Sequence, residues 1–352
     1  MSSSSVTADE MVRRVLVRSL SDIIVEHVPA PAPSAGEVVV SSSVVGICGS
    51  DVHAAAGRHP FITLPFHPGH EVVGVVKAVG RDVDPTWMGK RVVIEPNLAC
   101  GTCEQCQEGR YNICQTLDVF GCQTPGGLAD AFCIAVDRLH EVPDGMSDRQ
   151  AALVEPLATP VHAVRRAGDL SGRRVAILGA GPIGLFVLLA AIRAGAGSVV
   201  VGDLLGTKRA RAERLGAVGS FDAASVDGAA QAQRLLGGPA HVVFDCVSRE
   251  SSVHQAVELV AKGGKIMVVG VASGPTPVPL HLIQDRELSL IGNLMYVRED
   301  FESAIDILAQ GHVPLEEFIT ATFPLEAAAE AFAASAEPEH VKVLITMSSD
   351  GQ

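Results

Sequence analysis

A glycine-rich run in the middle of the chain constrains the fold more than any other feature. Residues 179–184 read Gly-Ala-Gly-Pro-Ile-Gly and lie between the apolar segment 175–178 and the Ala-rich segment 182–194. In a strand–turn–helix, glycines at this spacing permit a tight turn, close approach of a pyrophosphate, and tight helix–strand packing. The helix start would point free N–H groups at the phosphates. The residues of this predicted dinucleotide site are Gly179, Gly181, Pro182, Ile183 and Gly184.

The segments around this run alternate between strand and helix, which is typical of βαβ units on a parallel sheet. The expected strands are 175–178, 199–202, 242–245, 265–270 and 288–291, and the expected helices are 182–194, 208–215 and 252–261. The N-terminal part instead has short Val-rich runs between Gly, Pro and Asp turns, which indicate β structure. A helix at 300–310 and a strand at 341–347 follow the alternating part. We therefore expect a doubly wound α/β domain over residues 158–292 and a β-rich domain formed by 1–157 and 293–352.

An acidic residue ends the second expected strand of the α/β domain. Asp203 lies nineteen residues after Gly184. This is where a carboxylate can bind the ribose 2′-hydroxyl of NAD and repel the 2′-phosphate of NADP. Lys208 and Arg209 follow closely and could instead hold that phosphate. The acidic residue favours NAD, and the two basic residues leave NADP open.

Four cysteines in the β-rich part have the spacing of a metal site. Cys100, Cys103, Cys106 and Cys114 lie on one Gly-containing loop. Four thiolates this close can complete a tetrahedron around zinc and leave no open position. A redox Cys-x-x-Cys is disfavoured because the run does not begin a βαβ helix, and the nucleotide fingerprint disfavours an iron–sulfur cluster. We expect a structural zinc lobe over residues 97–115.

A second set of metal-ligand side chains is spread over three short motifs. A thiolate, an imidazole and carboxylates suit zinc, and a catalytic zinc takes three protein ligands with one position open. Cys48 and His70, with either Glu71 or Glu155, supply that number. Alone, each residue has a simpler reading as a buried thiol, a turn histidine or a helix-start charge. Together they predict a catalytic zinc, and hence two zinc ions per chain, with Asp51 accepting from the second ring nitrogen of His70.

Composition excludes several classes of partner. The formal net charge is −13 and no basic stripe is present, which argues against nucleic acid. The longest apolar run, 185–192, is far shorter than the ~18 residues of a membrane span. Eight cysteines without a secretion-type segment point to metal or redox chemistry rather than a disulfide framework. We expect a soluble, cytoplasmic protein without a nucleic-acid or membrane partner.

Together these motifs resemble the zinc-dependent medium-chain alcohol dehydrogenases, and most closely their polyol, sorbitol-type branch. The resemblance spans nearly the whole chain. It rests on the four-Cys lobe, the glycine run, and the motifs Gly-Ile-Cys-Gly-Ser-Asp-x-His at 46–53, Gly-His-Glu at 69–71 and Glu-Pro-Leu-Ala at 155–158. It implies a GroES-like catalytic domain, discontinuous in sequence, beside a Rossmann domain. It also implies a homodimer or homotetramer built through Rossmann-domain contacts.

The resemblance implies roles for matching positions. Zinc would lower the pKa of the substrate alcohol, and a hydride would move to NAD⁺. Ser50 matches the hydroxyl that takes the substrate proton, and His53 matches the relay to solvent. Glu71 and Glu155 share the remaining metal duty, one directly and one through the zinc-bound water. The positions that match cofactor contacts are Thr159 at the nicotinamide, Val269 and Val271 in the loop at its carboxamide, and Lys208 at the adenosine ribose, which weakens Lys208 as a sign of NADP.

Two departures from the polyol branch concern the substrate. Ala54, Ala55 and Ala56 stand where aromatic residues usually follow the relay histidine, and Leu-Met-Tyr at 294–296 replaces Phe-Arg-Tyr. A pocket with fewer donors suits a less hydroxylated, bulkier secondary alcohol. Cyclitol and threonine-type amino-alcohol oxidation remain alternatives, and an inactive protein on the same fold is disfavoured by the intact ligands and relay. The candidate pocket walls, with core packing as their alternative, are Phe120, Met295 and Tyr296.

Overall fold

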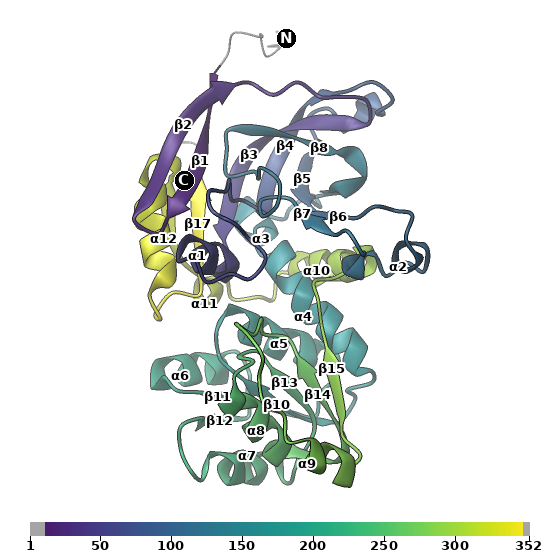
Figure 1. The fold of residues 1–352 in the computed structure, drawn as a ribbon, viewed down its shortest axis with the longest axis vertical. Coiled ribbons are helices and arrows are strands. Elements are labelled where there is room, and N and C mark those ends of the chain that lie inside the picture. Colours follow the sequence, from purple (N-terminus) through teal and green to yellow (C-terminus); the bar gives the residue numbers. More distant parts are fainter. Residues whose placement is uncertain (1–10, 348–352) are drawn as a thin grey trace. The chain divides into compact units, whose positions relative to one another are not determined.

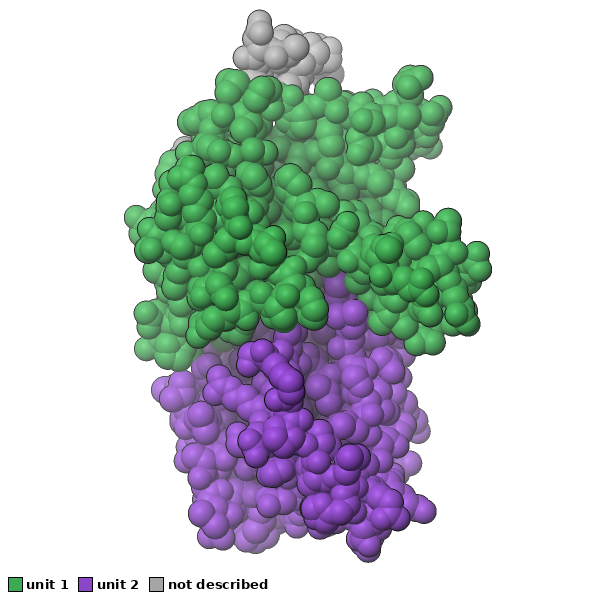
Figure 2. Space-filling model, in the orientation of Figure 1, with its two compact units in different colours: residues 1–155, 297–352 green, residues 156–296 purple. Residues whose placement is uncertain are grey.

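The computed structural model describes residues 11–347, and the chain divides into two compact units (Figure 2). The first unit runs to Glu155 and resumes at Val297, and the second is Pro156–Tyr296. Each unit has its own sheet and its own hydrophobic core. The two boundaries between the units fall close to the expected boundaries at 157/158 and 292/293. Among residues 11–347 no helix is both long enough and apolar enough to cross a bilayer.

The main sheet of the first unit is seven-stranded and mostly antiparallel. Its Val-rich strands bury alternate or consecutive residues, and each fully buried Val contributes roughly 1.5–3 kcal/mol. The C-terminal segment returns to this sheet, because the last strand pairs with β3 (Figure 1). The order is β16 (Ile319–Pro324), β17 (Lys342–Thr346), β3 (Glu37–Ile47), β4 (Glu71–Val79), β5 (Arg91–Ile94) and β9 (Leu139–Glu141), with β8 (Ala131–Ala135) also paired with β3.

Smaller elements complete the first unit. A hairpin of β1 (Met11–Ser19) and β2 (Asp22–Pro29) opens it. The cysteine-rich loop carries β6 (Asn97–Leu98), α2 (Glu104–Gln107), η2 (Tyr111–Ile113) and β7 (Asp118–Val119). The remaining turns and helices are α1 (Gly49–Ala55), η1 (Pro85–Trp87), η3 (Val136–Arg138), α3 (Asp148–Ala151), α10 (Arg298–Ala309), α11 (Leu315–Phe318), η4 (Leu325–Ala327) and α12 (Ala328–Ala336).

The second unit is a six-stranded parallel sheet with helices between successive strands (Figure 1). The strand order is β12 (Gly219–Asp222), β11 (Ser198–Asp203), β10 (Arg174–Leu178), β13 (Ala240–Asp245), β14 (Val260–Val268) and β15 (Ser289–Gly292). The order reverses between β10 and β13, which is the position where doubly wound sheets bind dinucleotides. The helices are α4 (Val154–Ala167, which begins in the first unit), α5 (Pro182–Arg193), α6 (Gly206–Arg214), α7 (Gly228–Leu236), α8 (Glu250–Leu259) and α9 (Leu280–Asp285).

Candidate active site

Three of the predicted catalytic ligands meet where β3 ends and β4 begins. Cys48 caps helix α1 directly after β3, His70 precedes β4, and Glu71 is the first residue of β4. The antiparallel pairing of the two strands places Gly46 opposite Glu71 and so closes the distance between the motifs. One ligand atom from each of the three residues lies within 4.8 Å of the other two. Of the two expected carboxylates, Glu71 joins this group and Glu155 does not.

The surroundings of His70 fit a metal ligand. Its Nδ1 lies 3.6 Å from Asp51 Oδ1, and Asp51 Oδ2 accepts from the backbone N–H of Cys48 at 3.0 Å. Asp51 Oδ1 is buried and has no hydrogen-bond partner among the described residues. A carboxylate on the Nδ1 side leaves Nε2 as the ring nitrogen for a metal. Burial lowers the pKa of His70, but the negative neighbours, Asp51 first, raise it well above its usual value; a bound metal would replace that proton.

Two further groups of this site lie outside the sequence motifs that predicted it. Cys122, on the turn after β7, places its Sγ 3.9 Å from His70 Nδ1. Lys342, the first residue of β17, places its Nζ 2.6 and 2.8 Å from the two oxygens of Glu71. A single charged residue inside the apolar run Val-Lys-Val-Leu-Ile was the available sign for Lys342. The fold brings both residues to the site from distant parts of the chain, so their spacing in the sequence does not indicate the contact.

The predicted proton pathway lies on helix α1. Ser50 is half-buried and His53 is exposed, one helical turn apart on the same side of the helix. His59 lies nearby: burial lowers its pKa, and the charges of His53 and His70 lower it further. An exposed imidazole one turn from a half-buried hydroxyl has the positions needed to pass a proton toward solvent. These roles remain predictions.

Ala54 and Ala55, which stand where the polyol branch usually has aromatic residues, do not face an open pocket within their own unit. Both side chains are buried, at 0% and 2% exposure, in the core of the first unit, where α1 packs against α12. Phe120 is also in that core, with its ring centroid 5.0 Å from that of Phe132. Tyr296 is fully buried. Met295, half-buried at φ 45°, is the candidate wall that the structure leaves partly accessible.

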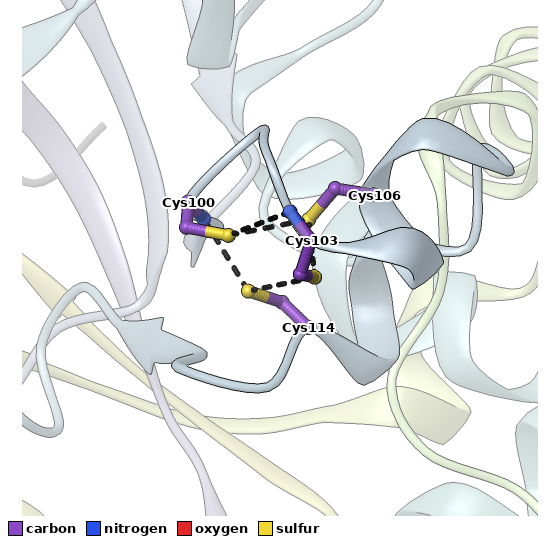
Figure 3. Close-up of side chains that lie close together, drawn as sticks. All are labelled: Cys100, Cys103, Cys106 and Cys114. Atoms are coloured by element: carbon purple, nitrogen blue, oxygen red, sulfur yellow. Dashed lines mark hydrogen bonds between the residues drawn. The ribbon is translucent and has the colours of Figure 1, made fainter.

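The four cysteines of the lobe converge on one point (Figure 3). Their Sγ atoms are separated by 3.9 Å for Cys100–Cys106, 3.4 Å for Cys103–Cys106 and 3.9 Å for Cys103–Cys114. A regular tetrahedron with zinc–sulfur bonds of ~2.3 Å has edges of ~3.8 Å, so the arrangement fits zinc. The N–H and hydroxyl groups of Thr102, with the N–H of Cys103, lower the pKa of Cys100 to about 5 and so favour the thiolate.

A buried polar network ties this lobe to the rest of its unit. The hydroxyl of Tyr111 donates to Glu95 at 2.5 Å and accepts from the backbone N–H of Arg298, at the start of α10. Glu95 is fully buried, and His140 lies against its second oxygen at 3.1 Å. Every partner of the Glu95 carboxylate is thereby on a different element. The network holds the zinc lobe against strands β5 and β9 and helix α10.

The glycine run forms the turn between β10 and α5. Gly179 has φ +95°, which favours glycine, and a Cβ on Gly184 would lie 1.8 Å from the Gly179 carbonyl oxygen. Asp203, at the end of the neighbouring strand β11, accepts from the N–H of Ala180 at 2.8 Å. Arg209 donates to the backbone carbonyls of Asp203 and Leu204, at 2.8 and 3.0 Å. The carboxylate is therefore beside the phosphate-binding turn, and Arg209 is held by the loop backbone.

The other predicted cofactor contacts are in the second unit as well. Thr159 is half-buried on α4, and Lys208 is half-buried on α6. Val269 is buried and its N–H donates to Asp245, whereas Val271 is 62% exposed on the loop that follows β14. The loop is thus exposed at Val271. Its role as the carboxamide contact stays a prediction.

Known proteins share this fold and are similar to this chain in sequence. Residues 34–144 match the alcohol dehydrogenase GroES-like domain, and residues 182–310 match the zinc-binding dehydrogenase family. Sorbitol dehydrogenase from Ovis aries is 36% identical over 94% of this chain and 95% of its own. A 2-dehydro-3-deoxy-L-galactonate 5-dehydrogenase from Pseudoalteromonas atlantica is 35% identical over 91% and 94%. The crystal structure of an alcohol dehydrogenase from Escherichia coli CFT073 with NADH has a TM-score of 0.90 at 28% identity, and covers 96% and 99%.

The fold and the two cysteine-containing clusters define a metal-dependent dehydrogenase with a nucleotide-binding domain. The chain belongs to the zinc-dependent alcohol dehydrogenase family, as its motifs predicted. The predicted fold class, a GroES-like catalytic domain with a Rossmann domain, is confirmed. The protein is an oxidoreductase that acts on an alcohol.

Proposed function

We propose that this enzyme oxidises a secondary alcohol or polyol to a ketone with NAD⁺, and catalyses the reverse reduction. The observation that supports this most is the convergence of Cys48, His70 and Glu71 beside a helix that carries Ser50 and His53. Zinc at this group would act as a Lewis acid toward the alcohol, and NAD⁺ would accept the hydride. Ser50 takes the hydroxyl proton and His53 passes it to solvent. Asp51 keeps His70 in the tautomer that presents Nε2.

The substrate class is supported by relatives and by the chain's own departures. The two curated relatives are named for sorbitol and for a deoxy sugar acid, both of which carry several hydroxyl groups. Met295, in place of an arginine of the polyol branch, removes one donor. We therefore propose a secondary alcohol with fewer hydroxyls than sorbitol, with a cyclitol or a threonine-type amino alcohol as the alternative.

A panel of substrates tests this directly. Purified enzyme with NAD⁺ would be assayed by NADH absorbance against polyols, vicinal diols, cyclitols, amino alcohols and aryl carbinols. We expect the highest kcat/KM for a diol or a carbinol, at least about tenfold above sorbitol, which corresponds to about 1.4 kcal/mol of transition-state binding. A preference for hexitols would show that Met295 does not shape the pocket. No turnover with any class would contradict the proposed function itself.

Asp203 is proposed to select NAD. Its carboxylate lies beside the glycine turn and would repel a 2′-phosphate, while Arg209 is already held by backbone carbonyls. We expect Asp203→Ala to weaken the binding of NAD⁺ by about tenfold, which is the cost of losing one hydrogen bond to a charged group. The preference of the enzyme for NAD⁺ over NADP⁺ should become smaller. KM values for both cofactors in parent and variant measure this. A parent that already prefers NADP⁺ would contradict the ribose assignment.

We also propose that the enzyme is a homodimer or homotetramer. Strand β15 is at the edge of the Rossmann sheet, and Leu290 on it is 40% exposed, close to Leu280 and Leu294 in sequence, which are 71% and 45% exposed. An unpaired strand edge with exposed leucines suits pairing with a second copy. Measurement of the molar mass in solution tests this.

We propose that the enzyme works in a reducing compartment such as the cytoplasm. Such a compartment suits the eight cysteines, all of which are free in the described residues.

A further inference from the structure

The Glu71 carboxylate is enclosed by three neighbouring strands. Glu71 opens β4, Gly46 pairs with it from β3, and on the other side of β3 lies β17, which begins at Lys342. A Cβ on Gly46 would lie 2.0 Å from Glu71 Oε2. The absence of a side chain at Gly46 therefore makes the space in which the carboxylate sits. Lys342 reaches the same space from across β3.

All of the hydrogen-bonding capacity of Lys342 is used in this space. Its Nζ donates to Glu71 Oε1 at 2.6 Å, to Glu71 Oε2 at 2.8 Å, and to the carbonyl of Ile47 at 3.2 Å. An ammonium group has three protons, so three acceptors satisfy it. Lys342 is 2% exposed and Glu71 is 1% exposed. Water does not compete for the pair, and the contact is held by both geometry and charge.

The pair is next to the proposed metal ligands. Glu71 shares its ligand group with Cys48 and His70, and the charges of Cys48 and Glu155 act on Lys342. Both oxygens of Glu71 are already bonded to Lys342. A carboxylate offers about four lone-pair positions, so a metal could still bind Glu71, but only by sharing it with the ammonium group. A shared carboxylate neutralises less of the charge of a metal ion.

We propose that Lys342 is a positioning residue that holds Glu71 in this orientation and limits how strongly Glu71 binds the catalytic zinc. This inference rests on the proposed function, because it requires the metal to bind at Cys48 and His70. The consequence is a metal with more residual positive charge toward the substrate oxygen. Lys342 thereby lowers the affinity of the site for zinc and raises the Lewis acidity of the bound ion.

The variant Lys342→Met tests this, because it keeps most of the length of the side chain and removes its charge. We expect zinc at the catalytic site to bind at least about tenfold more tightly, from the loss of a nearby positive charge, while kcat falls. Zinc affinity is measured by competition with a chelator, and the visible spectrum of the cobalt-substituted protein reports the ligand set. A purely structural role for Lys342 predicts the opposite sign, with weaker zinc binding and lower activity together.

Two variants serve as controls. Lys265→Met removes a half-buried lysine whose Nζ donates to the carbonyl of Ala167 at 2.7 Å, in the other unit; its zinc affinity should match the parent. Lys342→Met/Glu71→Gln removes both charges and should return the zinc affinity and the cobalt spectrum toward those of the parent. A double variant that binds zinc as tightly as Lys342→Met would overturn the role of Glu71.

Glu71→Gln alone decides the matter if Lys342→Met does not fold. Because Glu71 is shared, we expect zinc affinity to fall by no more than about 100-fold, the range for residues that support a metal ligand. A larger loss would identify Glu71 as a full ligand and overturn the proposal. If the parent itself holds one zinc per chain, in the four-Cys lobe, the proposed function fails; two zinc ions with unchanged affinity in Lys342→Met refute only the role of Lys342.

Discussion

Replacement of Cys48 by Ser should reduce turnover by about 10³-fold or more and lower the zinc content from two ions per chain to one. Cys48 supplies the thiolate of the catalytic group, and Glu71 is already shared with Lys342, so His70 would be the one remaining unshared ligand. Lewis-acid stabilisation by zinc is worth several kcal/mol, and each 1.36 kcal/mol is a factor of ten in rate. Metal analysis by mass spectrometry and steady-state assays measure both effects.

The matched control for this experiment is Cys133→Ser. Cys133 is half-buried in the same unit on β8 and belongs to neither cysteine cluster. It should keep both zinc ions and full turnover. NADH affinity should be unchanged in both variants, because the glycine turn is in the second unit. Retained turnover in Cys48→Ser with one zinc lost would mean that the cluster is not the catalytic metal site.

The parallel sheet was predictable because its strands are apolar runs bounded by glycine and by Asp203. The five predicted strands all exist, but strand β12 and helices α4, α7 and α9 of this unit were missed. Strand β12 reads Gly-Ser-Phe-Asp and buries one residue, Phe221, so it carries no apolar run. Backbone pairing with β11, rather than its own sequence, holds β12 in the sheet.

One boundary was wrong for a reason of tertiary pairing. The periodicity of residues 252–261 predicted a helix through Ala261, but α8 ends at Leu259 and β14 begins at Val260. Val260 pairs with Ala240 of β13, and the ladder then shifts register before Lys265. The glycines at 263 and 264 permit that irregularity. Local periodicity gives no information about a partner strand about twenty residues away.

The candidate metal ligands could be proposed from the sequence because ligand chemistry is local, whereas the groups that contact them could not. Cys48, His70 and Glu71 have distinctive neighbours in the sequence, and the structure brings them together. Strand register, which places Glu71 opposite Gly46, brings Glu71 rather than Glu155 into the candidate group. Lys342 lies 271 residues from Glu71 and comes to it only through the pairing of β17 with β3.

Two alanine variants in the glycine run, at Gly184 and at Gly181, should distinguish an effect on stability from an effect on cofactor binding. A Cβ on Gly184 would lie 1.8 Å from the Gly179 carbonyl oxygen, so Gly184→Ala must push α5 away from the turn after β10. We expect a loss of about 3 kcal/mol in the free energy of unfolding, the upper range for overpacking, together with loss of NADH binding. Denaturant unfolding and NADH fluorescence titration measure the two quantities.

Gly181→Ala should weaken NADH binding without lowering the stability of the fold. Gly181 has φ −76°, an ordinary value for alanine, and no heavy atom of the described residues would lie within 4 Å of its Cβ. We expect unfolding within about 0.5 kcal/mol of the parent, but NADH affinity at least about tenfold weaker, because the pyrophosphate needs that space. Parent-like NADH affinity in Gly181→Ala would show that the phosphates do not approach this turn, and the assignment of the cofactor site would fail even though the fold is right.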